Sequence, residues 1–249
     1  MSGFIGSGKI KIADYDSGAS FAARNFRDVG NASVFSYSFS EDKKELRDYQ
    51  DPAGGTADSV TRIDVVSGQI DFRNFSPENL ALALWGTTSV LGVTPITGEA
   101  HVIKAGLFIP TNRLINTTVA PVVTANGSTT VDTADYVVTA GGITIADTIT
   151  TATVSEDDPI TIGYTPVASS DVQAIINSAP NVSIFLEGIN AVTGKYATVR
   201  AYKAKLGVAQ NVSAIGDDFG TLTVAFTITK DSTVTGAGIS QFLKLEQET

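Results

Sequence analysis

Residues 219–229 read FGTLTVAFTIT and decide the fold class. Leu222, Val224, Phe226 and Ile228 alternate with threonine and alanine along this stretch. Because successive side chains of a β-strand point to opposite faces, this period-two pattern predicts a strand with one buried face and one hydroxyl-rich face. We therefore expect a sheet packed on a hydrophobic core.

Similar patterns recur on the N-terminal side of this stretch. Strand-like segments occur at residues 9–12, 35–39, 61–75, 100–109, 119–124, 136–139, 143–145, 182–189 and 196–206. Asn126-Gly127 and Gly141-Gly142 are typical of tight hairpin turns. After Gly68 the apolar residues change parity, which predicts a bulge or tight turn at Ser67-Gly68. The chain is therefore predicted to be all-β, with one or two short helices.

The two helices are expected at separate places in the chain. At residues 76–86, Ser76 can cap a helix and Pro77 fits its first position. At residues 172–179, apolar residues at i, i+3, i+4 and i+7 stop before Pro180 and favour a second helix. Both helices would be short and would pack on a sheet.

Charge is distributed unevenly along the chain. The sequence carries 17 Lys plus Arg against 26 Asp plus Glu, a net charge of -9. Residues 114–194 contain no Lys or Arg and eight acidic residues. We expect a β core from residues 1–113 and 195–249, with 114–194 either an inserted or outward-facing subdomain or a part of that core. Because an acidic surface repels phosphate groups, tight binding of nucleic acid is disfavoured.

Residues 41–59 read EDKKELRDYQDPAGGTADS and break the strand pattern. Charged residues followed by proline and glycine predict a long exposed loop. This loop is either simply solvated or a contact for a partner of mixed charge. The candidate contact residues are Lys43, Lys44, Glu45, Arg47, Asp48 and Tyr49.

Several kinds of enzyme chemistry are excluded because the chain lacks the residues that they require. There is no cysteine and a single histidine, which excludes thiol catalysis, thiolate metal sites and a zinc site with two histidines. His101 lies in a strand-like stretch without a recognisable serine and aspartate partner. Trp85 follows an apolar helix and is expected in the core or at an interface. We expect no enzymatic activity.

Three motifs partly match known ligand sites. Residues 3–9 have the spacing of a phosphate-binding loop, but Ile10 replaces the required Ser or Thr. Asp14-Tyr15-Asp16 resembles the start of a calcium-binding loop, but the residues that follow lack the glycine and the glutamate that such a loop requires at fixed positions. The acidic runs Glu156-Asp157-Asp158 and Asp217-Asp218 are typical of turns. We therefore assign no catalytic, cofactor-binding or metal-binding residue.

Neither a secretory signal nor a membrane span is recognisable. The first residues lack the apolar core of a signal peptide, so we expect the protein to stay in the cytosol that makes it. No stretch approaches the ~18–20 consecutive apolar residues of a spanning helix.

The succession of segments along the chain resembles the major tail tube proteins of long-tailed bacteriophages. The segments that carry this resemblance are SGFIGSGKIKIADYD (2–16), ASVFSYSFSEDKK (32–44), RIDVVSGQIDFRNFSPENLALALWG (62–86), DYVVTAGGITIADT (135–148), ITIGYTP (160–166) and GDDFGTLTVAFTITKDSTVTGAGISQF (216–242). They span most of the chain, and that family also resembles the tube protein of type VI secretion.

The resemblance implies a β-sandwich or β-barrel subunit that closes into a ring-shaped barrel when it forms hexamers. Such rings stack into the tube through which the genome passes, and the loop at 41–59 would reach a neighbouring ring. The implied partners are further copies of the chain and the tail terminator, tail-tip or baseplate, and tape-measure proteins. The implied location is the virion tail, assembled in the host cytoplasm. DNA would pass through without specific binding.

Two other classes of protein remain open from the residues themselves. An Ig-like β-sandwich module of a virion decoration or surface adhesin would expose a ligand patch and would not form stacked rings. A hydrolase on a β scaffold would need a converging acid pair or triad.

Overall fold

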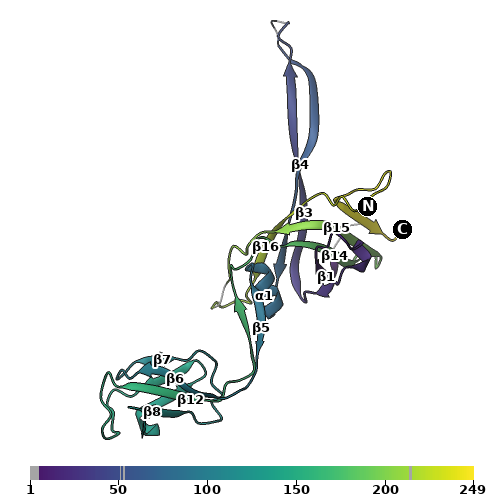
Figure 1. The fold of residues 1–249 in the computed structure, drawn as a ribbon. Helices are drawn as coiled ribbons and strands as arrows, with labels where there is room; N and C mark the ends of the chain where they lie inside the picture. The colour runs from purple at the N-terminus through teal and green to yellow at the C-terminus, as the bar shows by residue number, and fades with distance from the viewer. Residues whose placement is uncertain (1–5, 51, 53, 213–214) are drawn as a thin grey trace. The chain divides into compact units, whose positions relative to one another are not determined.

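The computed structural model describes residues 6–50, 52, 54–212 and 215–249, which fall into two compact units (Figure 1). The main unit lies within residues 1–88 and 172–249, and the inserted unit comprises residues 89–171. The bounds differ from the expected 114–194. Strands between residues 96 and 110 pair inside the inserted unit, whereas residues 181–190 pair with the N-terminal strand.

An antiparallel sheet of eight strands forms the main unit. The strands are β1 (Gly6–Asp14), β2 (Arg27–Asp28), β3 (Ala32–Arg47), β4 (Thr56–Phe72), β14 (Asn181–Asn190), β15 (Tyr196–Leu206), β16 (Leu222–Ile228) and β17 (Leu243–Gln247). Their order is β2-β1-β14-β15-β16-β4-β3, and β17 pairs with β15. The sheet is open, and the described residues of this chain form no closed barrel.

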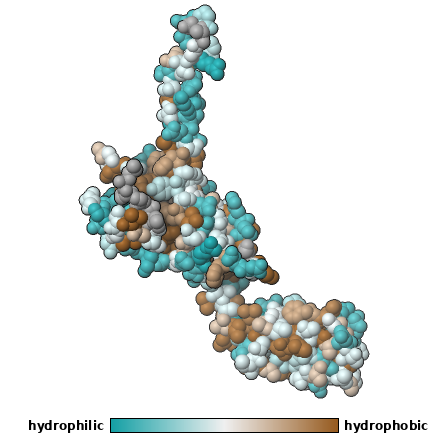
Figure 2. All heavy atoms as spheres, turned by 180° about the vertical axis from the view of Figure 1, so that it is seen from behind, coloured by the Kyte–Doolittle hydropathy of each residue, from teal (hydrophilic) through white to brown (hydrophobic). Residues whose placement is uncertain are grey.

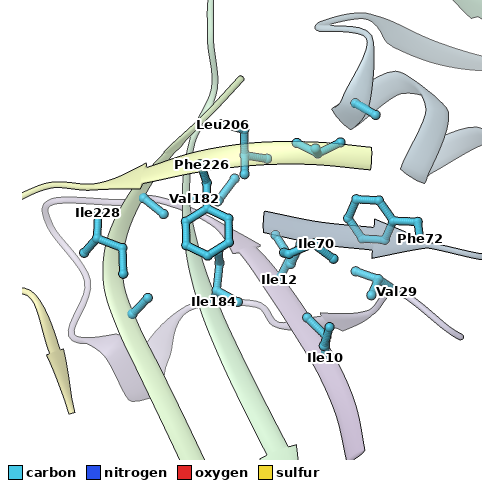
Figure 3. Close-up of a cluster of buried hydrophobic side chains, with 14 of the residues drawn as sticks. Ile10, Ile12, Val29, Ile70, Phe72, Val182, Ile184, Leu206, Phe226 and Ile228 are labelled. Carbon is cyan, nitrogen blue, oxygen red and sulfur yellow. The ribbon is translucent and has the colours of Figure 1, made fainter. Parts of the chain in front are cut away.

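The core of the main unit lies on one face of this sheet (Figure 3). Leu222, Val224, Phe226 and Ile228 are all buried, as their alternation in the sequence predicts. They pack with residues from other strands of the sheet, including Ile10, Ile12, Ile70, Phe72, Val182 and Ile184. Removing one such side chain from water contributes about 1.5–3 kcal/mol, so these strands hold the unit together.

The bulge predicted at Ser67-Gly68 is absent. Strand β4 continues through this point in register with both neighbours. A Cβ on Gly68 would lie 2.3 Å from the Phe226 ring and 2.4 Å from the Ser36 carbonyl oxygen. The glycine therefore makes room for a buried aromatic ring. The β3–β4 pair has three register shifts, all at other places, and Asp64 is the extra residue at one of them.

One of the two expected helices forms. Helix α1 (Pro77–Ala83) begins as predicted, and the Ser76 hydroxyl accepts a hydrogen bond from the Asn79 N–H at 3.2 Å. The prediction of a helix at 172–179 is wrong. Residues 172–173 end β13 (Ser169–Gln173), which pairs with β5 (Thr87–Leu91), and residues 174–179 form neither helix nor strand. A short 3-10 turn, η1 (Phe21–Ala23), completes the helical elements described in the main unit.

The inserted unit is built from two further antiparallel sheets. One contains β6 (Ile96–Val102), β12 (Pro159–Tyr164), β8 (Val122–Ala125) and β9 (Thr129–Thr130) in that order. The other contains β10 (Tyr136–Thr139), β11 (Gly142–Ile145) and β7 (Phe108–Pro110), with η2 (Thr133–Asp135) before it. Its core is separate from that of the main unit and includes Ile103, Ile115, Val123, Ile143, Ile160 and Ile162.

The fold class is thus mostly β with antiparallel sheets, as the sequence predicts. Among the described residues, no helix has the length and apolar character required to cross a membrane.

Candidate interaction surface

Strand β3 is a long edge of the main sheet. It is 16 residues long, stands at the end of the strand order, and pairs with β4 alone within the described sheet. Its other edge therefore presents a row of unpaired backbone N–H and C=O groups. Monomeric proteins usually shorten, cover or bend such edges, so an open edge of this length is suited to pairing with another strand.

An aromatic ladder runs along β3 from the core to the surface. The ring centroids of Phe35 and Tyr37 are 6.3 Å apart, and those of Tyr37 and Phe39 are 5.9 Å apart. Phe35 stacks on the core residue Phe226 at 6.0 Å, whereas Phe39 is 55% exposed. Aromatic side chains therefore continue along β3 from the core to solvent-exposed positions.

Beyond this ladder, β3 and β4 continue as a two-stranded hairpin, here called the arm (residues 40–65). The loop expected at 41–59 is mostly strand, because β3 reaches Arg47 and β4 starts at Thr56. The described residues of the arm are exposed, apart from a half-buried Asp48. In Figure 2 the arm shows hydrophobic residues among hydrophilic ones. Leu46, Val60 and Ile63 are each more than half exposed.

All six predicted contact residues lie on the arm. Lys43 and Glu45 lie on one face of β3, and Lys43 Nζ is 2.6 Å from Glu45 Oε1. Lys44 and Asp42 lie on the other face, and Lys44 Nζ is 3.9 Å from Asp42 Oδ2. These exposed pairs connect neighbours on one strand and contribute little to stability.

The remaining predicted residues lie at the end of the hairpin. Arg47 ends β3. The Asp48 N–H donates to the Gly55 carbonyl at 2.8 Å, and its carboxylate accepts from the Gln50 N–H at 2.8 Å. Tyr49 is 86% exposed.

No other described residue of the main unit covers the arm. A hairpin of two strands is at best marginally stable in water, because it buries little apolar area. The exposed Leu46, Val60 and Ile63 gain nothing from the rest of the unit. Packing against another surface would therefore stabilise the arm.

A groove of about 550 Å³ opens beside the start of β3. The described residues that line it include Ile10, Val34, Phe35, Leu186, Val199 and Leu245, and none of them is charged. Residues of β1, β3, β14, β15 and β17 contribute, so the groove continues the core toward the surface.

A buried ion pair anchors the segment after β16. Arg24 Nη2 lies 3.0 Å from Asp231 Oδ2, and both side chains are almost fully buried. Arg24 also donates to the Ser183 hydroxyl at 2.7 Å, and Tyr15 donates to Asp231 at 3.0 Å. Burial alone would raise the pKa of Asp231, but hydrogen bonds from Thr233, Arg24 and Tyr15 outweigh it and lower that pKa. This network is structural, since it connects loops to β14.

His101, for which the sequence shows no catalytic partners, contacts Glu99 on the same strand. His101 Nε2 lies 2.8 Å from Glu99 Oε1, and Glu99 also accepts hydrogen bonds from the Tyr164 hydroxyl and the Asn112 N–H. Burial acts to raise the pKa of Glu99, but these donors lower it overall. Each member of the cluster is satisfied by another, so the geometry favours a structural role. The i, i+2 spacing of Glu99 and His101 is the sequence signal that could have indicated this contact, because such residues lie on the same face of a strand.

Asp135 is a buried carboxylate of the inserted unit. It accepts hydrogen bonds from the backbone N–H and hydroxyl groups of both Thr150 and Thr151. The hydroxyl of Thr151 is the largest influence, and the pKa of Asp135 falls to about 2. The carboxylate therefore closes the loop around residues 150–151.

The partial motifs have ordinary structural positions. Gly3 to Ile5 of the phosphate-loop match lie outside the described residues, and Gly6 to Lys9 belong to β1. Asp158 caps its own turn by accepting from the Ser155 N–H at 2.8 Å. The described residues contain no group of three His, Asp or Glu placed to hold a metal. Trp85 has a buried indole N–H without a hydrogen-bond partner and lies just after α1.

A family model described as "Protein of unknown function UCP028589" matches residues 3–246. The chain belongs to this family. No curated protein matches the chain.

Proposed function

We propose that the chain is a structural, non-enzymatic subunit that assembles with copies of itself into six-membered rings, and that these rings stack into a phage tail tube. The open 16-residue edge of β3, extended by the uncovered arm, is the observation that supports this proposal most directly. Both features are costly in a monomer and useful in an assembly.

In the proposed ring, the edge of β3 pairs with a strand of the next subunit. Contacts between two different surfaces of identical subunits generate closed rings or open filaments. Closing the ring removes the exposed edges and completes a barrel around a lumen. The arm, with Lys43, Lys44, Glu45, Arg47, Asp48 and Tyr49, then reaches a neighbouring ring and gains the cover that its own unit does not provide.

The charge of the chain fits a conduit for DNA. A net charge of -9 repels phosphates, so DNA would slide through the lumen without specific binding. The proposed partners are further copies of the chain, the tail terminator, the tail-tip or baseplate proteins and the tape-measure protein. The proposed location is the virion tail, after assembly in the host cytoplasm.

Negative-stain electron microscopy of the purified protein across concentration and salt tests this proposal. Rings or hollow tubes with an open lumen are the expected result. Dispersed monomers at every concentration, with tail-tip components added as a nucleus, would contradict it.

The inserted unit supports a second candidate function. Its two antiparallel sheets and separate core resemble what an Ig-like decoration or adhesin module needs. A monomeric protein that binds cell envelopes or assembled virions, and never forms rings, would favour this second function.

A further inference from the structure

The loop before β16 exposes two large apolar side chains beside two carboxylates. Ile215 is 97% exposed and Phe219 is 91% exposed, with Asp217 and Asp218 between them. The Arg73 guanidinium holds the backbone of this loop by donating to the Phe219 carbonyl at 2.9 Å. Single exposed apolar residues are ordinary, but two almost fully solvated ones within five residues are suited to anchor a contact. Residues 215–219 are called the acidic loop below.

The outer face of β1 and β14 contains a hollow of about 310 Å³ in the same unit. Its lining includes the backbone of the cross-strand pair Gly8 and Gly188. Ile189 and Tyr196 add apolar surface, and Tyr196 is 66% exposed. The hollow has room for one aromatic or aliphatic side chain.

Two lysines stand beside this hollow. Lys9 and Lys11 line it together with Asp28 and Glu187. Lys11 is already engaged, because its Nζ lies 2.7 Å from Glu187 Oε2. Lys9 forms no ion pair with another residue in the described part of the chain. Lys9 faces Glu187 across the two strands and its charge helps to lower the pKa of Glu187. A carboxylate that arrives at the hollow therefore finds an ammonium group that Glu187 attracts but that has no ion pair of its own in the described part of the chain.

We propose that the acidic loop of one subunit docks into this hollow on a second copy of the chain. Phe219 or Ile215 fills the hollow, and Asp217 or Asp218 pairs with Lys9. The nearly complete exposure of Ile215 and Phe219 shows that these two side chains are not seated on the described part of their own subunit. This contact rests on the proposed self-assembly and names a second pair of surfaces, distinct from β3 and the arm. Because donor and acceptor differ, the contact can close a ring.

Truncating the anchors is the first test. The variant Ile215→Ser/Phe219→Ser should keep the unfolding temperature, because both side chains contact solvent almost alone. Its self-association, measured by sedimentation velocity, should weaken about tenfold or more, as expected for removing two buried anchors. The matched control is Val90→Ser, since Val90 is 87% exposed in the inserted unit and should leave association unchanged.

Cross-linking locates the contact. A carbodiimide joins a carboxylate to an amine as an amide with loss of water, which the reagent takes up as its urea. In an equal mixture of ¹⁴N- and ¹⁵N-labelled protein, Lys9 should couple to Asp217 or Asp218 in peptides of mixed label. Lys9→Glu should remove this association, and Lys9→Glu combined with Asp218→Lys should restore it.

The outcomes separate this contact from the proposed function. If the Ile215→Ser/Phe219→Ser variant forms normal rings, the contact is overturned while the tube proposal stands. If cross-links between copies form as expected but rings never appear, the contact stands and the tube proposal fails. Cross-links confined to single copies, or a failed charge exchange, overturn the contact.

Discussion

Reversing the basic charges of the arm should separate folding from assembly. The variant Lys43→Glu/Lys44→Glu/Arg47→Glu changes the net charge from -9 by six units to -15. Within the subunit it removes the Lys43–Glu45 and Lys44–Asp42 pairs, whose side chains are all 44% exposed or more. Exposed pairs contribute at most about 1 kcal/mol each, so the subunit loses no more than ~2 kcal/mol.

The effect on stacking should be larger. Two unit charges about 4 Å apart in water interact by ~1 kcal/mol, so each reversal changes an attraction across a contact into a repulsion of the same size. Three reversals then cost up to ~6 kcal/mol per subunit at low ionic strength, and salt reduces this value. Tubes should become short or absent while single rings persist.

Thermal unfolding reports the fold of this variant, and electron microscopy at low and high salt reports tube length. The variant Lys43→Arg/Lys44→Arg keeps both charges on the same strand and serves as the control, with tubes of normal length. Normal tube length and stability in the charge-reversed variant would refute the assignment of the arm to contacts between rings.

Three further substitutions test the internal structure, each measured by chemical denaturation. Asp135→Asn should destabilise the inserted unit by about 1–3 kcal/mol, because the carboxylate loses hydrogen-bond acceptors. The wild-type pKa of about 2 lies below the ordinary 3.8, so the stabilisation by the Asp135 carboxylate is complete above about pH 4 and is lost as the pH falls through about 2. The variant should lack this pH dependence. Arg24→Ala leaves the Asp231 carboxylate buried without its cation and should cost about 3–5 kcal/mol, whereas an unchanged midpoint would contradict the role of the pair. Gly68→Ala should cost about 1–3 kcal/mol because its Cβ meets the Phe226 ring and the Ser36 carbonyl oxygen, and a stabilised variant would show that both can move aside.

The core of the main unit was predictable because its signal is local. In residues 219–229 every second side chain is apolar, and the strand buries that set. Helix α1 was predictable for a similar reason, since Ser76 and Pro77 act within one turn. The strand and the helix are both determined by residues that are close together in the sequence.

The arm was not predictable in this way. Its charged residues, Pro52 and the Gly54-Gly55 pair fit a loop by composition. Its strands exist because each pairs with the other from Ser40–Val65 to Arg47–Thr56, across two register shifts. The stretch at 172–179 failed for the opposite reason, because an i, i+3, i+4 pattern also occurs in a strand followed by an irregular turn. The unit boundaries were misplaced because charge is a surface property and does not follow chain topology.

In the proposed assembly, the residues that make the open edge of β3 prone to aggregation also make its pairing specific. Phe35, Tyr37 and Phe39 alternate with serines, so the two faces of the strand differ in chemistry along the ladder. A strand that adds to this edge with a slip of one residue would place its apolar side chains on the serine face. Such a slip loses the aromatic contacts, so only one of the two alternating registers is favourable. The interleaved charges of the arm, and the net charge of -9, oppose unspecific association before that register is found. An edge that would cause random aggregation in a uniformly apolar strand can therefore direct ordered growth.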